Sequence, residues 1–193
     1  YTQVKYGNVA LDSVEVNGAM SIIADIENVD IAEGRYFTEA ENNAGRRLAF
    51  LGADIASKLN QSGTMIDKEI EIAGLSYRVI GVAVAKGTIF GQPQDGFITI
   101  PLKTYSKDFS LRYRERGLTL LATAKSDMLF DDAVEEVRQL MRVQRHLNID
   151  EADNFGVQTP DAIAGLRDRI FGPIFVVAIA IPSIALLVGG IVI

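Results

Sequence analysis

The single histidine is the residue with the clearest potential for acid–base chemistry. His146 ends an amphipathic segment, and Asp150, Glu151 and Asp153 follow it closely enough in sequence to orient an imidazole. Catalysis would also require a nucleophile held against the histidine. A histidine at the end of a helix has a simpler role, because its cationic form interacts favourably with the negative end of the helix dipole. We therefore interpret His146 as a helix-end residue and not as a catalytic base.

A glycine-containing run from Gly81 to Thr88 superficially resembles a phosphate-binding loop. In such a loop the lysine follows a glycine and precedes a serine or threonine, and a helix starts there. In this sequence Lys86 comes before Gly87, and no helical pattern follows. The Lys86-Gly87 dipeptide therefore predicts a turn.

The remaining charged side chains indicate no specific site. The basic run from Arg112 to Arg116 contains one aromatic residue and is too short for a nucleic-acid patch, so we interpret it as an exposed hairpin edge. The carboxylates show no spacing that would separate a metal or glycosidase site from solvated surface. Those considered are Glu39, Glu41, Asp67, Glu69, Glu71, Asp131 and Asp132. We predict no catalytic, cofactor-binding or metal-binding residues.

The composition excludes several classes of protein. With 193 residues, no cysteine and one histidine, the chain cannot form a Cys/His zinc site, a disulfide or a catalytic thiol. The net charge of −6 is the wrong sign for a nucleic-acid partner, because phosphate binding requires clustered lysine and arginine. We therefore expect no nucleic-acid partner.

The charged residues are distributed unevenly along the chain. All of them lie between Tyr1 and Arg169, whereas residues 170–193 carry none and are mostly apolar. As a helix, this segment would be roughly 36 Å long, enough to cross a hydrocarbon core of about 30 Å. We therefore predict a transmembrane helix over residues 170–193, in contact with the lipid bilayer.

A helix start precedes this apolar segment. Thr159 is typical of an N-cap, Pro160 of the first helical turn, and Asp161 favours the positive end of the dipole. The helix that begins there would run into the membrane and couple the preceding body to it as a rigid rod. The chain begins without an initiator methionine at Tyr1 and stops inside the apolar run, so we interpret it as a segment of a longer polytopic protein.

Hydrophobic periodicity predicts a mixed α and β body. The strongest soluble helix is expected from Met128 to His146, and the clearest hairpin turns at Ala73-Gly74. Shorter helices are expected over residues 22–29 and 53–59, and strands over residues 47–51, 97–100, 118–124 and 154–158. This order predicts an α+β fold with a β-rich insert between its N-terminal and C-terminal parts.

Segments along most of the chain resemble, in order, the MacB-type permeases of ABC transporters. The matching segments are Gly34–Thr38, Leu51–Leu59, Ile70–Val82 with Lys86-Gly87 behind it, Asp95–Thr104, and Arg145-His146 followed by Asp153–Phe155. Residues Ser183–Ile191 resemble the start of the second transmembrane helix of these permeases. Each segment is short, and their common order makes the resemblance specific.

The resemblance implies an extracytoplasmic domain between the first and second transmembrane helices of a permease. It implies a porter-like α/β subdomain from residues 1–34 and 118–169, an inserted β-rich subdomain from residues 35–117, and a truncated transmembrane helix at 170–193. Residues 1–169 would then be periplasmic, at the bacterial cytoplasmic (inner) membrane, despite Arg167 and Arg169 beside the apolar segment.

The resemblance also implies a function. Such a domain would transmit an ATP-driven conformational change across the membrane for export or efflux of a drug, peptide or lipoprotein-type substrate. It would be no enzyme and would use no cofactor, because ATP would be hydrolysed by a separate domain or subunit. Its partners would be that ATPase, a second permease copy in a homodimer and, in some relatives, a periplasmic adaptor and an outer-membrane channel.

Two alternatives remain from the sequence. The chain could be a membrane-anchored regulatory domain that controls an envelope enzyme such as a cell-wall hydrolase. It could also be an anchored envelope enzyme, which the lack of a convincing active site disfavours. The sequence does not name the cargo.

Overall fold

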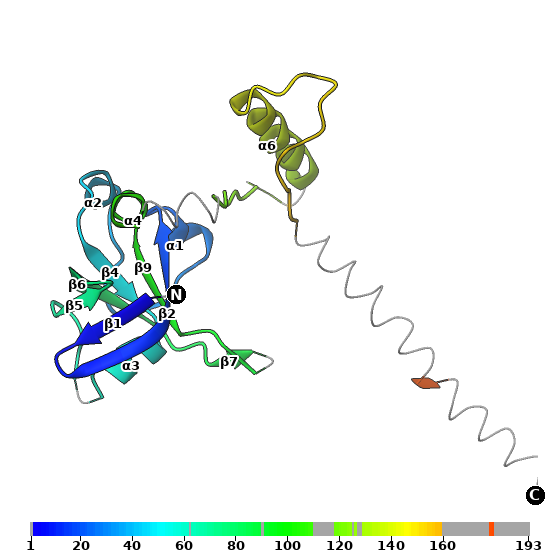
Figure 1. Cartoon of the computed structure of the whole chain (residues 1–193). Helices are drawn as coiled ribbons and strands as arrows, with labels where there is room; N and C mark the ends of the chain where they lie inside the picture. The colour runs from blue at the N-terminus through cyan, green and yellow to red at the C-terminus, as the bar shows by residue number, and fades with distance from the viewer. Residues whose placement is uncertain are drawn as a thin grey trace, which may run out of the picture. The chain divides into compact units, whose positions relative to one another are not determined.

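The chain forms two compact units, Tyr1–Thr123 and Ala124–Ile193 (Figure 1). The computed structural model describes residues 2–61, 63–89, 91–109, 118–124, 126, 129–159 and 178–179. Every strand in these described ranges belongs to the first unit, and the longest helix belongs to the second. We call them the barrel unit and the helical unit.

The barrel unit is built on a seven-stranded sheet in the order β3-β6-β4-β9-β2-β1-β5. Because β5 pairs with β6 as well as with β1, the strands from β6 round to β5 close into a barrel. Strand β3 lies outside this ring, on the second half of β6. The strands are β1 (Thr2–Tyr6), β2 (Val9–Ala19), β3 (Ile31–Gly34), β4 (Leu48–Leu51), β5 (Glu69–Ile72), β6 (Leu75–Ala83) and β9 (Phe97–Pro101). A separate small hairpin pairs β7 (Thr88–Ile89) with β8 (Gln92–Pro93).

Alternation along the strands sends one set of side chains into the barrel. Val14 and Val16 of β2 are buried, whereas Glu15 and Asn17 between and after them are exposed. Helix α3 (Ala53–Leu59) adds two apolar side chains to the same core. The main core cluster contains Val4, Val14, Val16, Ala49, Leu51, Ile55, Leu59, Met65, Ile70, Ile72, Tyr77, Val79, Val82, Ile98, Ile100 and Tyr105. Burial of these side chains is the main force that stabilises the barrel unit.

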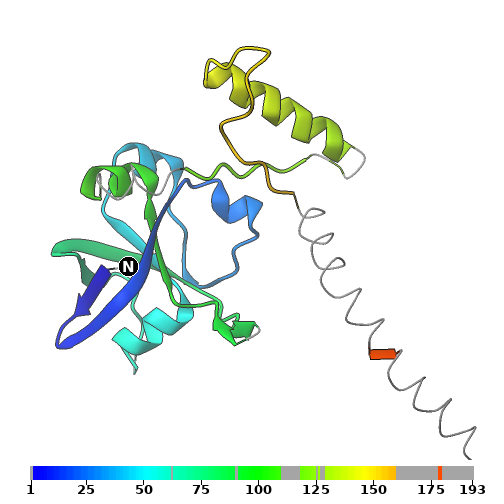
Figure 2. The same cartoon turned by 45° about the vertical axis from the view of Figure 1, so that its right-hand side comes forward.

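Two short helices lie side by side on the barrel unit, α2 (Glu39–Asn43) and α4 (Leu102–Asp108) (Figures 1 and 2). The Lys103 ammonium donates to the carbonyl of Asn43 at 2.7 Å, and the Thr104 hydroxyl donates to the carbonyl of Arg46 at 2.8 Å. Helix α4 also lies so close to β2 that a Cβ at Gly18 would stand 2.5 Å from the Cβ of Tyr105. These contacts join α2, α4 and β2.

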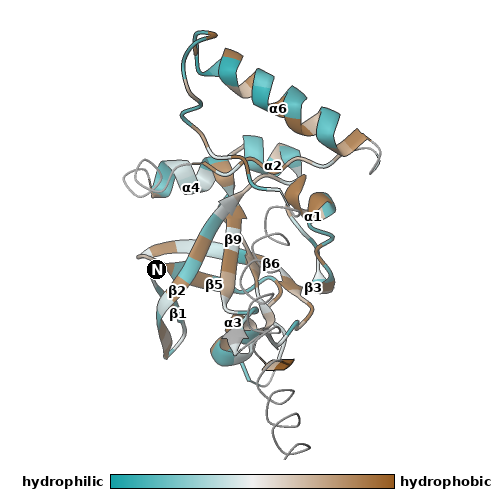
Figure 3. Ribbon diagram, turned by 90° about the vertical axis from the view of Figure 1, so that its right-hand side faces the viewer, coloured by the Kyte–Doolittle hydropathy of each residue, from teal (hydrophilic) through white to brown (hydrophobic). Residues whose placement is uncertain are grey.

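The helical unit contains α6 (Phe130–Gln144), and none of its residues is buried. Figure 3 shows hydrophilic and hydrophobic bands alternating along its turns, as its amphipathic sequence predicts. The chain then turns at His146, which has a φ of 54°, and continues through residues 147–159 without a further helix or strand.

Several predicted elements are confirmed. The helix expected over residues 53–59 is α3, the hairpin at Ala73-Gly74 is β5 with β6, and the amphipathic helix is α6. The short helix α1 (Ile23–Ile26) lies within the expected range 22–29, and the strands expected at 47–51 and 97–100 are β4 and β9. The mixed α/β class is therefore confirmed.

Other predicted elements are wrong or were missed. The strands expected over Leu118–Ala124 and Asn154–Gln158 do not form, since both segments are described and neither is a strand there. An alternating pattern shows that a segment suits a pleated surface, but not that a partner strand is available. Strand β1 and most of β2 were missed, because polar residues such as Asp12 and Ser13 interrupt their apolar pattern.

The predicted transmembrane helix at 170–193 lies outside the described residues except at positions 178 and 179, and the helix expected from Thr159 lies almost wholly outside them. No helix within the described ranges is long and apolar enough to span a membrane. The division into residues 1–34 with 118–169 and an insert at 35–117 stays a prediction. Strands from residues 1–34 and 35–117 do share the one large sheet.

Candidate functional site

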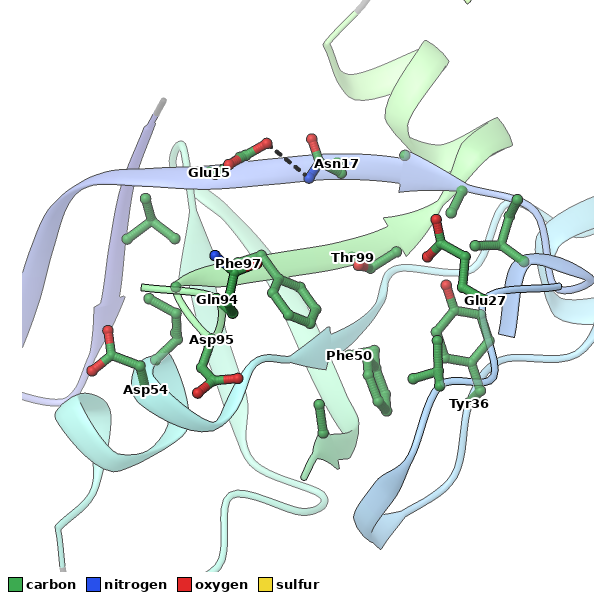
Figure 4. Close-up of a pocket in the computed structure, with 18 of the residues that line it drawn as sticks. Glu15, Asn17, Glu27, Tyr36, Phe50, Asp54, Gln94, Asp95, Phe97 and Thr99 are labelled. Carbon is green, nitrogen blue, oxygen red and sulfur yellow. Dashed lines mark hydrogen bonds between the residues drawn. The ribbon is translucent and has the colours of Figure 1, made fainter. Parts of the chain in front are cut away.

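A groove of about 1460 Å³ lies on the outer face of the barrel (Figure 4). Its floor comes from the outward residues of β2, β9 and β4. Its walls come from residues 20–30, from the turn before β9, and from the leucines at 118, 120 and 121. The groove is therefore made entirely by the barrel unit, from segments that are distant in sequence.

The floor of the groove follows from strand alternation. Because Val14, Val16, Ile98 and Ile100 point into the core, the intervening residues of β2 and β9 point outward, among them Thr99. On β2 the Asn17 amide donates to the Glu15 carboxylate at 3.1 Å, as Figure 4 shows. The centre of the floor is therefore polar.

One end of the groove is aromatic. The Tyr36 ring stacks on Phe37 with ring centroids 4.2 Å apart and meets the edge of Phe50 at 4.9 Å. Figure 4 shows Glu27 beside Tyr36. Burial raises the pKa of the Tyr36 hydroxyl above its ordinary value of 10, and the Glu27 carboxylate raises it further. The hydroxyl is therefore neutral at physiological pH and offers a hydrogen-bond donor at this end.

The other end is held by Asp95. Its side chain is buried, and its carboxylate accepts the backbone N–H groups of Lys86 at 2.9 Å and Gly87 at 2.7 Å. Nearby, the Lys58 ammonium is paired with Asp54 at 2.7 Å. Asp95 is thus an anchor for the loop that carries β7 and β8, and its two oxygens are already occupied.

The charge of the groove limits what it can bind. Carboxylates outnumber ammonium groups among the residues that line the groove. The carboxylates belong to Asp12, Glu15, Glu27, Asp30, Asp54 and Asp95, and the ammonium groups belong to Lys58 and Lys86. Such a surface repels anionic ligands and suits neutral or cationic ones. Aromatic and aliphatic walls add apolar contact area. The arrangement is therefore suited to binding, and no nucleophile–base pair is assembled among the described residues that line it.

The structure describes His146 and the carboxylates that were considered beside it. It is exposed at the end of α6, where its backbone N–H donates to the carbonyl of Val143 at 3.1 Å. Of the carboxylates expected beside it, Asp153 is bound by Arg138 and Arg142, and Glu151 accepts from the backbone of Asn148. The geometry agrees with our interpretation of His146 as a helix-end residue.

The Gly81–Thr88 run is not a phosphate loop. Gly81 lies within β6, where an added Cβ would stand 2.3 Å from the carbonyl oxygen of Arg35. The amides of Lys86 and Gly87 both donate to Asp95, so they are not available to a phosphate. Gly87 has a positive φ of 76°, but residues 84–87 form neither a turn nor a helix, so the predicted turn is not confirmed.

The other charged candidates include carboxylates that the structure describes and an arginine-containing run that it does not. No group of carboxylate and histidine side chains within the described ranges could hold a metal ion. Glu41 is paired with Arg35 at 2.7 Å, and together with Thr38 it forms the capping box of α2. The side-chain hydrogen bonds from Arg35 lower the pKa of Glu41 to about 2. The Arg112–Arg116 run lies outside the described residues.

Two of the segments that carried the family resemblance contain glycines that position the barrel strands. A Cβ at Gly34 would stand 2.2 Å from the carbonyl oxygen of Ile80, and one at Gly52 would stand 2.2 Å from that of Asp95. Both glycines therefore allow backbones to cross closely. Several residues of these segments line the groove, among them Tyr36, Asp54, Asp95 and Thr99, but sequence reasoning did not single them out as site residues. The alternation of Glu15 and Asn17 was the available signal for the floor of the groove.

Comparisons with known proteins agree on a family. The model of the MacB-like periplasmic core domain matches residues 1–140. The chain is 29% identical over 192 residues to the pyoverdine export ATP-binding/permease protein PvdT of Pseudomonas aeruginosa, covering 97% of this chain and 28% of that protein. It is 31% identical over 129 residues to the macrolide export ATP-binding/permease protein MacB of Chlorobaculum tepidum, covering 65% of this chain and 19% of that protein. The chain thus spans 28% or less of these two relatives.

Solved structures share the fold. The extracellular domain of the noncanonic ABC-type transporter YknZ from Gram-positive bacteria superposes with a TM-score of 0.60 at 17% identity, covering 76% of this chain and 72% of that one. The periplasmic region of MacB from Actinobacillus actinomycetemcomitans gives a TM-score of 0.55 at 16% identity, covering 72% and 62%. The chain therefore has the mixed α/β fold of these extracytoplasmic domains.

Proposed function

This chain belongs to the family of MacB-like periplasmic core domains, and from that premise we propose that it is the periplasmic part of an ABC exporter permease in the bacterial inner membrane. In this proposal it transmits an ATP-driven conformational change for export or efflux of a drug, peptide or lipoprotein-type substrate. The observation that carries the proposal is the similarity to PvdT, which covers 97% of the chain and therefore extends into the uncharged segment 170–193.

The proposal assigns no catalysis to this chain. ATP would be hydrolysed in a separate domain or subunit, consistent with the names of the relatives as ATP-binding/permease proteins. The groove supports a binding role, because its walls combine carboxylates with aromatic rings around a polar floor. The further partners would be a second permease copy and, for export across an outer membrane, an adaptor and a channel.

Topology is the first test, and this chain itself contributes no cysteine to the background. In a full-length permease whose other cysteines have been replaced, an Ile149→Cys variant carries a thiol at a position that is 96% exposed. A membrane-impermeant maleimide should label this variant in intact spheroplasts. An Ile98→Cys variant, whose side chain is 0% exposed, should be labelled only after denaturation. Labelling of Ile149→Cys only after membrane lysis would contradict a periplasmic location.

Transport is the second test. Deleting the gene that encodes this chain should cause its exported molecule to accumulate inside the cells, and a permease with an inactive ATPase should not restore export. If export is unchanged and cell-wall hydrolysis changes instead, the regulatory alternative replaces this proposal.

A further inference from the structure

The helical unit is held together around the side chain of Arg142. This residue lies in the last turn of α6, and its guanidinium donates to the Asp153 carboxylate through Nη1. Its Nη2 donates to the carbonyl oxygens of Asn148 at 2.6 Å, Ile149 at 3.3 Å and Glu151 at 2.9 Å. One side chain on the helix therefore binds four groups of the segment that follows it.

A second arginine completes this arrangement. Arg138 lies one turn before Arg142, and its Nη1 donates to the other oxygen of Asp153 at 3.0 Å. The two arginines therefore share one carboxylate, and their hydrogen bonds hold the pKa of Asp153 below its ordinary value, with Arg142 the larger cause. We call Arg138, Arg142, Asp153 and the carbonyl groups that Arg142 binds the arginine clasp.

A second contact fixes the segment just beyond the clasp. The Arg145 guanidinium donates to the Asn154 side chain at 3.1 Å and lies 5.9 Å from the centroid of the Phe155 ring. Arg138 and Arg142 thus bind residues 148–153, and Arg145, just beyond the last residue of α6, binds Asn154. The segment lies along the end of the helix as far as Phe155.

Hydrophobic burial does not explain why this segment is ordered. No residue among 129–159 is buried, and Leu140, Val143 and Ile149 are 62%, 73% and 96% exposed. Charge-assisted hydrogen bonds are roughly twice as strong as neutral ones. They are therefore the main interactions that hold residues 147–155 against α6. Arginine suits this role because its planar group presents five donors in a fixed geometry, whereas lysine offers a single point charge.

The position of the clasp in the chain suggests what it does. Residues 147–155 connect α6 to the segment that leads into the uncharged residues 170–193. We propose that Arg142 is a positioning residue that holds residues 147–155 against α6. A movement of α6 is then passed to residues 147–155, and the reverse, instead of being lost by bending at the turn around His146. This inference rests on the proposed function, because it supplies a mechanical joint for the conformational change that the permease transmits.

The first experiment tests, in the full-length permease, whether Arg142 holds these residues against α6. Spin labels on cysteines at Glu136 and Ile149, both exposed, report the distance between α6 and the returning segment. An Arg142→Ala variant should broaden this distance distribution. Gln139→Ala, an exposed change on the same helix, should leave it narrow, and Arg142→Lys should give an intermediate width. An unchanged distance distribution in Arg142→Ala would contradict the proposal that Arg142 holds residues 147–155 against α6.

The second experiment tests transmission. In the same permease, Arg142→Ala should lower cargo export about fivefold or more, the range expected for loss of a coupling between sites, while ATP hydrolysis stays close to wild type. Gln139→Ala should leave both rates unchanged. A damaged fold would reduce ATP hydrolysis and membrane insertion as well, so the ratio of export to hydrolysis isolates the positioning role.

The outcomes separate this inference from the proposed function. Normal export by Arg142→Ala with a broadened distance distribution would overturn the inference and leave the exporter assignment standing. A wild-type permease that hydrolyses ATP but exports nothing would refute the proposed function and with it the transmission role. The distance measurement would still decide whether Arg142 holds residues 147–155 against α6.

Discussion

The barrel unit and the helical unit are stabilised in different ways. The barrel encloses one continuous apolar cluster, in which residues such as Val4, Leu51 and Ile98 are 0% exposed. The described part of the helical unit buries no residue and is held by the arginine clasp. One unit therefore depends on hydrophobic burial, and the other depends on a few directed polar contacts.

This difference bears on the proposed transmission of movement through the domain. A closed barrel resists deformation, because every strand in the ring is paired on both sides and the core is close-packed. Segments with few buried apolar contacts open locally at low cost in free energy. The helical unit is therefore the place where a single substitution should change a connection without unfolding the domain.

The largest contrast is expected between two leucine-to-alanine substitutions. Leu51→Ala empties a fully buried site and should cost about 2–5 kcal/mol of unfolding free energy, whereas Leu140→Ala, at 62% exposure, should change it by less than about 0.5 kcal/mol. All tyrosines lie in residues 1–113 and the chain has no tryptophan, so tyrosine fluorescence during urea unfolding reports the barrel. A similar loss in both variants would mean that α6 packs in a core.

Two glycine substitutions sharpen the comparison. Gly52→Ala places a Cβ 2.2 Å from the backbone oxygen of Asp95 and should cost about 1–3 kcal/mol by overpacking. Gly156→Ala has no atom within 4 Å of the added Cβ and should leave the barrel transition unchanged. Thermal unfolding of the two variants measures the change in stability that each substitution causes. A tolerated Gly52→Ala would show that the crossing of these backbones is not close.

Acid should affect the two units in different ways. Arg47 lowers the pKa of Asp108 in the barrel unit, and Arg142 lowers that of Asp153 in the helical unit, both from an ordinary value of 3.8. A lowered pKa adds stability that is complete above the ordinary value and is lost as the pH falls through the folded value. Acidification below about 4 should therefore weaken the barrel transition through Asp108 and release residues 147–155 through Asp153.

Asparagine variants check the assignment of these acid effects. Asp108→Asn should flatten the acid dependence of the tyrosine-detected transition. Asp153→Asn should abolish the acid release of residues 147–155, measured by hydrogen exchange, and leave the barrel transition as in wild type. If Asp153→Asn instead alters the barrel transition, the two units are not independent.

Arg145→Ala should have a small and local effect. This change removes the hydrogen bond to Asn154 and the cation–π contact with Phe155, which together should contribute about 0.5–1 kcal/mol to local stability. Hydrogen exchange of residues 153–157 measures this loss, and Arg145→Lys should recover part of it. An effect as large as that of Arg142→Ala would mean that the clasp extends along the whole segment.

Much of the fold could be predicted where one segment carries its own pattern. Helix α3, the hairpin of β5 and β6, and helix α6 were visible because their hydrophobic periods are local. Closure of the barrel was not visible, because it depends on pairing of Val4 and Lys5 with β5, nearly seventy residues away. No local pattern records such a register.

The same difference between local and long-range patterns applies to the arginine clasp and to the groove. In the sequence, Arg138 and Arg142 stand four residues apart, which places them on one face of the predicted helix, and Asp153 was considered only as a carboxylate near His146. Their partnership was missed, because the acceptor comes from beyond a turn whose geometry depends on the positive φ of His146. The groove was missed because its floor and walls come from segments spread over residues 10–121.

Amide hydrogen exchange across a denaturant series tests the contrast between the units most directly. Amides in β6 and β9 should exchange with the free energy of global barrel unfolding, whereas amides in residues 147–155 should exchange through a local opening of much smaller free energy. Arg142→Ala should abolish protection in residues 147–155 and leave the barrel amides unchanged. If both groups exchange with the same free energy in wild type and weaken together in Arg142→Ala, the two units form one cooperative structure and the account is wrong.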